Sequence, residues 1–254
     1  MSRLHHLAVM VRRVDGAIRF FRDLLGLTLI KKTVNLDDPY TPLLIFGDQR
    51  GTPGTQIHCF VYPKSARAVV GVGTVASFSL GVPPGSLDYW ERRLKKSRRR
   101  SNGVRLEGYD GLSLVLSETD EDCGWNYDPR SDVPKTCAIR GLHSTEVVVD
   151  PVGHKFWMSQ NCSGVRLSSG EEKGALGYGG VHHLAFVGSG RAVFDRYDYR
   201  SSYFYDPGGL LCEIVEGPGL VLDKPVVKLS DGWCLPPVFE RRGIEIENVL
   251  RSMK

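Results

Sequence analysis

The sequence predicts an α+β fold made of four tandem modules, and an internal repeat is the main basis for this prediction. Residues 4–9 read LHHLAV and residues 181–186 read VHHLAF, so two His doublets, each followed by Leu-Ala, lie in apolar strand-like segments. Segments 74–82 (TVASFSLGV) and 141–149 (GLHSTEVVV) are weaker echoes that also read as strands. The module starts are separated by 70, 67 and 40 residues, which indicates that the last two modules are shortened.

The first module shows the order β-α-β-β-β most clearly. A strand is predicted over Leu4–Val11 and an amphipathic helix over Asp15–Leu25, because apolar residues recur there at spacings of three and four. Asp15 is a suitable N-cap, and Gly26 stands where a helix commonly ends. Three more strands are predicted, separated by turn-rich stretches: Leu27–Val34, Leu43–Phe46 and Gln56–Tyr62.

The other modules repeat this order less completely. In the second we expect a strand over 74–82, a helix over Leu87–Lys96 and a strand over Leu112–Ser117, with the middle strand short or missing. In the third, a strand begins at Gly141 and a helix is predicted over Lys155–Asn161. The fourth has strands at 181–187, about 199–205 and 210–216, and no helix of normal length.

The segment between Glu118 and Lys135 is acidic and then rich in Pro and Asp, which is typical of a linker. We therefore predict an N-terminal domain over residues 1–120, a linker over 121–137, and a shortened C-terminal domain with a tail over 138–254.

Composition excludes several classes of protein. Hydrophobic residues make up 41% and charged residues 24% of the chain, so it is neither disordered nor fibrous. No apolar run approaches the roughly 18 residues of a membrane span, and the N-terminus shows no signal-peptide cleavage site. We expect no membrane association.

The net charge of +4 is too small to indicate nucleic-acid binding, and we interpret the basic run Lys95–Arg100 as a solvated helix end. The six Cys have no CxxC spacing, which favours reduced thiols and a cytoplasmic location.

The His doublets are candidate metal ligands. Side chains alternate between the faces of a strand, so His6 shares a face with Ala8, and His183 shares one with Ala185. His5 and His182 share the opposite faces with larger apolar residues, which we expect to pack under cover. The second His of each doublet therefore points to an open face, where the two rings could meet across a cavity.

Glu213 is the candidate third ligand, because it is an acid inside the otherwise apolar strand 210–216 and a buried carboxylate needs a partner. Two imidazoles and one carboxylate form the facial triad of non-haem Fe(II) oxygenases. His58, His143 and His154 have no partner pattern, so we interpret them as structural, and Asp37 and Asp38 as turn caps. A cluster that precedes Glu213 suits an anionic or phenolic substrate, although a plain surface strand explains it equally well: Arg196, Arg200, Tyr203 and Tyr205.

At these residues the chain resembles the vicinal-oxygen-chelate superfamily, also called the glyoxalase/bleomycin-resistance/extradiol-dioxygenase superfamily. Within it the chain is similar to bacterial ring-cleaving dioxygenases that open hydroquinones. The matching segments extend from Leu4 to Glu247, and KKTVNLDDP together with the two His doublets is the specific combination: LHHLAV, GLTLIKKTVNLDDP, FGDQRGTPGT, PPGSLDYW, AIRGLH, GGVHHLAF, YRSSYFYDPGGLLCEI and LPPVFERRGIEIE.

The resemblance implies that the modules pair into two vicinal-oxygen-chelate domains, the C-terminal one truncated. It also implies one Fe(II), or Mn(II), held by His6, His183 and Glu213, the residues that strand parity selects. It implies catalytic roles beside the metal for His5, His182, Arg196 and Tyr203. The implied substrates are O2 and a hydroquinone or related dihydroxylated ring, and a homo-oligomer is left open. In the family a Thr usually follows the first ligand by two residues, where this chain has Ala8.

The shortened modules leave alternatives open. The chain lacks the helix that would cover the strand of His183, so apolar surface near Leu184 and Phe186 is either exposed or covered by something else. A degenerate, metal-free member that binds a small aromatic molecule without turnover is therefore the second hypothesis. A metal lyase or isomerase of the glyoxalase kind ranks lower, because strand Gln56–Tyr62 offers no acid.

Overall fold

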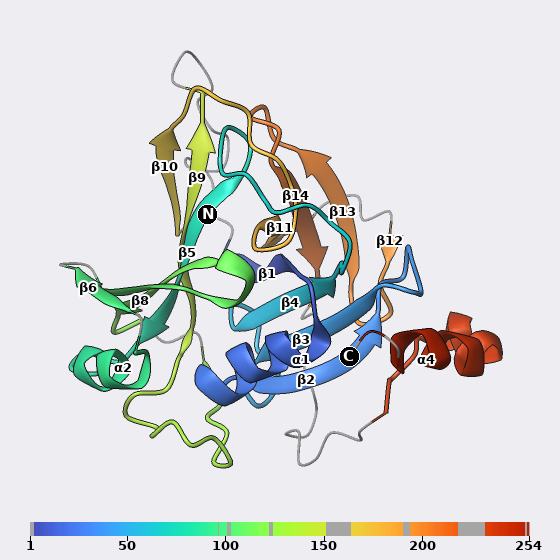
Figure 1. Cartoon of the computed structure of the whole chain (residues 1–254), viewed down its shortest axis with the longest axis horizontal. Helices are drawn as coiled ribbons and strands as arrows, with labels where there is room; N and C mark the ends of the chain where they lie inside the picture. The colour runs from blue at the N-terminus through green and yellow to red at the C-terminus, as the bar shows by residue number, and fades with distance from the viewer. Residues whose placement is uncertain are drawn as a thin grey trace.

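The computed structural model consists of two twisted β-sheets with few helices (Figure 1). The structure describes residues 3–95, 97–100, 103–121, 124–150, 164–189, 194–217, 232–251 and 253. The predicted helix over Lys155–Asn161 lies outside these residues. The sheet-rich α+β architecture confirms the predicted fold class, and the two sheets fit paired modules.

The first sheet joins the first and fourth modules. Its strands, in spatial order, are β12 (Phe194–Asp195), β13 (Arg200–Tyr205), β14 (Leu211–Glu216), β11 (Val181–Val187), β1 (Leu4–Val11), β4 (Gln56–Val61), β3 (Pro42–Gly47) and β2 (Thr28–Val34). The two strands that carry the His doublets, β1 and β11, pair antiparallel at its centre. Each of them also pairs in parallel with the last strand of its own module, β4 or β14.

The second sheet joins the other two modules in the same way. Its order is β10 (Val165–Ser169), β9 (Gly141–Val149), β5 (Val75–Val82), β8 (Ser113–Glu118), β7 (Gly103–Glu107) and β6 (Arg98–Arg100). Strands β5 and β9 pair antiparallel at its centre. Each sheet thus combines strands from both halves of the chain, and the division at residues 121–137 stays a prediction about the sequence.

The helices are short, and η1 packs against the first sheet, where the ring centres of Phe21 and Phe46 lie 5.2 Å apart. Helix α1 (Val14–Ala17) continues as the π-helical segment η1 (Ile18–Leu24), which agrees with the helix predicted over Asp15–Leu25. Gly26 ends it with a positive φ of 75°, a backbone conformation that favours glycine. The other helical elements in the described residues are α2 (Leu87–Arg93), the 3₁₀ turns Tyr109–Gly111 and Pro237–Arg242, and the C-terminal α4 (Gly243–Arg251).

A single large core covers the strands of the shortened fourth module. Leu184 and Phe186 are fully buried, in the same apolar cluster as Phe78 of β5 and Val147 of β9. Of the two outcomes left open for this surface, cover by other parts of the chain is therefore the one observed.

The second module differs from its prediction. The basic run does not end a helix, because Arg98–Arg100 forms the edge strand β6, paired with β7. The module therefore has a middle strand that the sequence analysis expected to be short or missing. Arg99 contacts Asp88 and Glu91 of α2, and charged side chains are common on edge strands, where they prevent further pairing.

The described part of the predicted linker, residues 121 and 124–137, contacts both the first and the second module. The Trp90 indole nitrogen donates to the Cys137 carbonyl at 2.9 Å, and Val133 is fully buried in the core. Buried Asp48, in the turn after β3, accepts hydrogen bonds from Thr52 and from the Asn126 backbone N–H, the latter at 2.7 Å.

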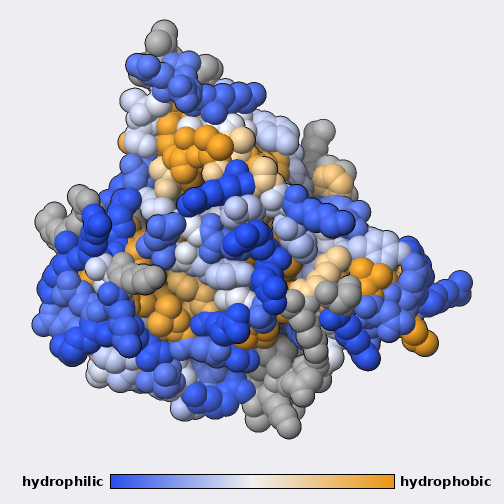
Figure 2. Space-filling model, viewed as in Figure 1, coloured by the Kyte–Doolittle hydropathy of each residue, from blue (hydrophilic) through white to orange (hydrophobic). Residues whose placement is uncertain are grey.

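The face of the molecule seen in Figure 2 is mainly hydrophilic, with separate apolar patches. Exposed apolar side chains include Val69, Val70 and Leu176, in the segments that precede β5 and β11. In the described part of the chain, no helix has the length and hydropathy needed to cross a membrane.

Replacing Asp48 by Ala should destabilise the protein by about 2–4 kcal/mol, because several buried donors would lose their acceptor at once. Urea denaturation measures this change. Exposed Asp23 is the matched control, and Asp23→Ala should change the free energy of unfolding by less than about 0.5 kcal/mol. Equal effects of the two variants would contradict the docking of residues 124–137 through Asp48.

Candidate metal centre

Two β-bulges shape the centre of the first sheet. From Leu4 to His6, β1 advances two residues while β11 advances one, so the extra residue is His5. Between the pairs Ala8–His183 and Val9–Val181 the situation is reversed, and His182 is the extra residue on β11. A bulge redirects side chains locally, which corrects the parity argument. The first His of each doublet does not stay on the covered face but lies against the second His.

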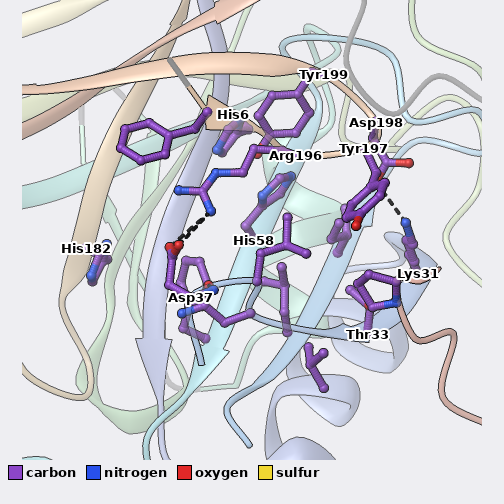
Figure 3. A pocket seen from close by; sticks show the side chains of 18 of the residues that line it. His6, Lys31, Thr33, Asp37, His58, His182, Arg196, Tyr197, Asp198 and Tyr199 are labelled. Carbon is purple, nitrogen blue, oxygen red and sulfur yellow. Dashed lines mark hydrogen bonds and ion pairs between the residues drawn. The ribbon is translucent and has the colours of Figure 1, made fainter. Parts of the chain in front are cut away.

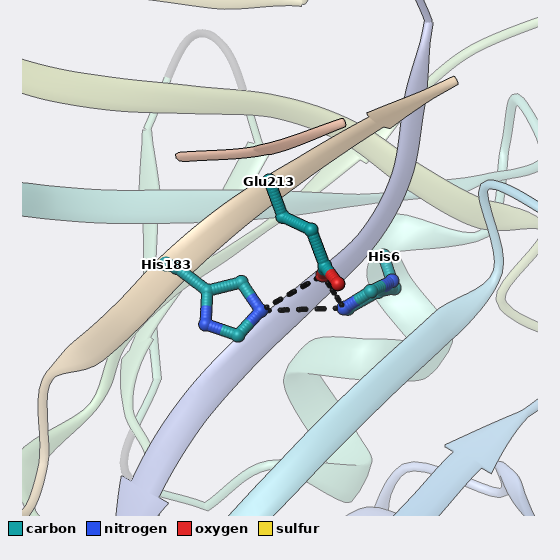
Figure 4. A group of neighbouring side chains, drawn as sticks. All are labelled: His6, His183 and Glu213. Carbon is teal, nitrogen blue, oxygen red and sulfur yellow. Dashed lines mark hydrogen bonds and ion pairs between the residues drawn. The ribbon is translucent and has the colours of Figure 1, made fainter. Parts of the chain in front are cut away.

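His6, His183 and Glu213 converge between β1, β11 and β14 (Figure 4). The Nε2 atoms of His6 and His183 lie 3.0 and 3.2 Å from Glu213 Oε2 and 3.4 Å from each other. Among the described residues, this is the one group of three His, Cys, Asp or Glu side chains whose possible ligand atoms all lie within 4.8 Å. All three side chains are buried.

The first His of each doublet fixes the ring of the second. His5 Nδ1 lies 2.9 Å from His6 Nδ1, and His182 Nδ1 lies 2.8 Å from His183 Nδ1. If the Nδ1 atoms of His6 and His183 donate in these contacts, both Nε2 atoms keep their lone pairs for a metal. The predicted roles of His5 and His182 beside the metal fit this geometry, and they stay predictions.

The residues present fit a divalent cation. Both oxygens of Glu213 are buried, and neither has a well-aligned hydrogen-bond partner among the described residues. Burial alone would raise the pKa of Glu213, but His6 and His183 hold this pKa well below its usual range, so the carboxyl group is ionised. Burial lowers the pKa of His183, which favours the neutral imidazole that a metal requires. Two neutral imidazoles and a carboxylate are the donors of a facial triad.

A pocket of about 730 Å³ opens beside these ligands (Figure 3). Its roof is the segment from Phe194 to Tyr199, which two ion pairs attach to β2 and the turn that follows it. Arg196 contacts Asp37 at 3.0 Å, and Lys31 contacts Asp198 at 2.8 Å. Asp37, predicted as a turn cap, instead binds this Arg, whereas Asp38 does cap its turn.

Arg196 and Tyr203, predicted from the resemblance, both line the pocket. The guanidinium carbon of Arg196 lies 5.2 Å from the ring centre of Tyr203, and its Nε is buried without a hydrogen-bond partner among the described residues. Burial and the charge of Glu213 raise the pKa of Tyr203, so its phenol is neutral. Arg200 and Tyr205 are exposed and do not line the pocket.

Two of the pocket residues that the sequence analysis missed lie beside His6. Tyr199 is partly buried, with its ring 6.0 Å from that of His6. Its signal was the alternation of the strand predicted over about 199–205, which places residues 199 and 203 on one face. His58, interpreted as structural, stacks on His6 at 3.9 Å and lines the pocket. It pairs with Ala8 as Glu213 pairs with Ala185, so His58 and Glu213 hold corresponding positions in the two modules.

The second sheet repeats the strand register of the first sheet without its candidate metal ligands. Strands β5 and β9 have the same pattern of bulges, so by register Ser77 and Ser144 take the places of His6 and His183. In the second sheet Arg166 is the register partner of Glu146, and in the first sheet Glu213 is the register partner of Ala185. Arg166 therefore holds the position of Glu213, and a guanidinium replaces the carboxylate. These replacements do not suit a cation, and one metal centre is expected for the two sheets.

Comparison with known proteins agrees with this geometry. Residues 3–96 match the model of the Glyoxalase/Bleomycin resistance protein/Dioxygenase superfamily. The chain is 27% identical to the "Putative ring-cleaving dioxygenase MhqA" of Bacillus subtilis, with 100% of this chain and 99% of that protein covered. The crystal structure of a "putative dioxygenase" from Bacillus subtilis superposes on this structure with a TM-score of 0.81 at 27% identity. The superposition covers 97% of this chain and 95% of the other. Residues 3–96 are therefore similar to this superfamily, and nearly the whole chain is similar to these two proteins.

A further relative bears on the superfamily's chemistry. The chlorohydroquinone/hydroquinone 1,2-dioxygenase of Sphingobium indicum is 27% identical, with 98% of this chain and 95% of that protein covered. The alignment with MhqA extends over 314 residues, whereas this chain has 254. The alignment covers 99% of MhqA, so this chain lacks residues that MhqA has within the aligned region. This difference agrees with the shortened modules.

Divalent metal should stabilise the wild-type protein and not the Glu213→Gln variant. At about 100 times the dissociation constant, a ligand of the folded state adds about 2.7 kcal/mol to the free energy of unfolding. Thermal unfolding without oxygen, with and without Fe(II) or Mn(II), measures this effect. Glu146→Gln, which changes an acid on the second sheet, is the control and should keep the shift. An equal shift in the Glu213 variant would overturn the assignment.

Proposed function

We propose that the protein is an Fe(II)-dependent extradiol-type dioxygenase that cleaves a hydroquinone or a related dihydroxylated aromatic ring with O2. The observation that carries this proposal is the buried His6–His183–Glu213 triad at one end of a pocket lined by aromatic and cationic side chains. The similarity to relatives named as ring-cleaving and hydroquinone dioxygenases supports it.

The metal, held by these three side chains, would supply Lewis acidity and redox chemistry, and the triad leaves one face of it for substrate and O2. Fe(II) is our assignment, and Mn(II) has the same donor preferences for this set. The chain itself binds the ring, excludes water and controls protons. Burial of all three ligands removes the competing water that would otherwise reach them.

Three further side chains orient the substrate in this proposal. Arg196, whose guanidinium lies near the ring of Tyr203 in the lining of the pocket, stabilises a phenolate oxygen, while Tyr203 donates its phenolic hydrogen. His182 lines the pocket, and because its Nδ1 contacts His183, its Nε2 is the atom left to exchange a proton with substrate. His5, which does not line the pocket, acts only through the ring of His6.

The cellular setting stays part of the proposal. No disulfide joins the four described Cys, which agrees with reduced thiols and a cytoplasmic location. A homo-oligomer remains a prediction without a structural test. The complete ligand set argues against the degenerate, metal-free alternative, and β4 offers His58 and Gln56 rather than the acid that a glyoxalase-type lyase would need.

Iron-loaded protein should consume one O2 per hydroquinone ring opened, and His6→Ala should abolish both oxygen uptake and iron retention. Even an outer partner of a metal ligand contributes 10–100-fold to affinity, so loss of a ligand should exceed about 100-fold. An oxygen electrode and elemental analysis measure the two quantities. His143→Ala is the control. Unchanged cleavage and iron content in His6→Ala would refute the proposal, and binding without turnover in the wild type would favour the degenerate reading.

Arg196→Lys should lower kcat/KM for a hydroquinone by about 100-fold, because Lys lacks the planar guanidinium fork of Arg. Arg92→Lys, a replacement at an exposed position of α2, should leave the value unchanged. Steady-state oxygen uptake over a range of substrate concentrations separates kcat from KM. Wild-type kinetics in Arg196→Lys would remove Arg196 from the proposed mechanism.

A further inference from the structure

The pocket extends far beyond the metal ligands, across the open face of the first sheet. Two rows of register partners run over the four strands β1, β4, β3 and β2: Ala8, His58, Ile45 and Lys31 in one, and Met10, Phe60, Leu43 and Thr33 in the other. Three strand spacings, about 14 Å, separate the two ends of these rows. The middle of this floor is apolar, because Ile45, Leu43 and Phe60 line the pocket there.

The C-terminal tail closes the far end of this floor. Residues 234–237 line the pocket, and the Cys234 N–H donates to the Lys32 carbonyl of β2 at 2.8 Å. Leu235 belongs to an apolar cluster that ties α4 to β2 through buried Val34, Ile246 and Leu250. The far wall is therefore anchored to the sheet and offers Leu235, Pro236 and Pro237 to an occupant.

Charged groups at the pocket are paired with each other. Lys31, at the outer end of one row, is held by Asp198, and Asp37 is held by Arg196. Among the described residues, the far half therefore presents no unpaired charge to an occupant, whereas the groups that suit a phenol lie at the metal end: Arg196, Tyr203 and His182. An occupant that complements this pocket is polar at the metal end and apolar over the remainder.

The volume of about 730 Å³ is in the upper part of the range for drug-sized ligands, which is about 300–1,000 Å³. A ring with two hydroxyl groups occupies only the metal end. We propose that the substrate is a hydroquinone with an extended apolar substituent, an alkyl chain or a second ring, which lies over Ile45 and Leu43 and reaches Leu235. This inference rests on the proposed function for the ring, and on the pocket alone for the substituent.

Anaerobic calorimetry with iron-loaded protein tests the substituent directly. The ligands are hydroquinone, methylhydroquinone, butylhydroquinone and octylhydroquinone. Affinity should rise by about three- to fourfold for each added methylene group until the chain reaches the far wall, because each CH2 leaves water for an apolar surface. Oxygen uptake with the same compounds then reports ring cleavage separately from binding.

Two variants locate the gain. Leu43→Trp fills the floor, and Leu235→Gln makes the far wall polar without adding bulk, so it keeps the test valid if the larger residue disturbs folding. In both, the ratio of octylhydroquinone to methylhydroquinone affinity should fall about tenfold or more. Val69→Trp, at a side chain that is 54% exposed and outside the pocket, is the matched control and should preserve the wild-type ratio.

The binding and oxygen-uptake measurements distinguish a failure of this inference from a failure of the proposed function. Cleavage of hydroquinone with an affinity that is flat or falls with chain length would overturn the extended substituent and leave the dioxygenase proposal intact. An affinity that rises with chain length, lost in the two variants, without oxygen uptake for any compound would support the substituent site and overturn ring cleavage. An unchanged ratio in both Leu43→Trp and Leu235→Gln would overturn the assigned path.

Discussion

The antiparallel pairing of β1 with β11 is the constraint on which the rest of the structure depends. It brings residues almost 180 positions apart into register, and a bulge at the first His of each doublet turns both doublets toward one another. The strands on either side then follow from parallel pairing, so β14 supplies Glu213 and β4 supplies His58 at corresponding positions. A slip of one residue in this pairing would send the ligand side chains to the opposite face. The register of one strand pair therefore fixes both the fold and the ligand set.

The sequence was sufficient for most strands of the first sheet, for the first helix and for the proximity of His6, His183 and Glu213, because each of these depends on local periodicity or on the internal repeat. It was not sufficient for what tertiary pairing decides. Strict alternation placed His5 and His182 under cover, since a bulge leaves no mark in the pattern of apolar residues. In the sequence, the basic run at Arg98–Arg100 looks like a helix end. Only its pairing with β7, which local patterns do not reveal, shows that it is a strand. His58 could be recognised only through its register with Ala8, which is a long-range fact.

The second sheet shows that the scaffold and the chemistry are separable. Its central strands have the same bulges and the same sequence of parallel neighbours as those of the first sheet, yet Ser77, Ser144 and Arg166 stand where the ligands would be. Hydroxyl groups satisfy one another there, as Ser79 and Ser144 do at 2.7 Å, and no cation is needed to offset a buried carboxylate. The proposed function therefore depends on three side chains on a repeated frame, and fold alone does not predict it.

The same separation explains how the shortened modules keep a complete site. The ligands lie on the central strands of the sheet, whose positions are fixed by backbone pairing on both sides and by one continuous core. A peripheral helix contributes cover, and other parts of the chain supply that cover here, since Leu184 and Phe186 remain fully buried. The outer strands are held differently. The first and last strands of the sheet are at opposite ends of the strand order, yet the Arg196–Asp37 and Lys31–Asp198 pairs join the segment after β12 to β2 and the turn that follows it. Both pairs line the pocket, so the contacts that close the curled sheet also form the roof over the proposed substrate.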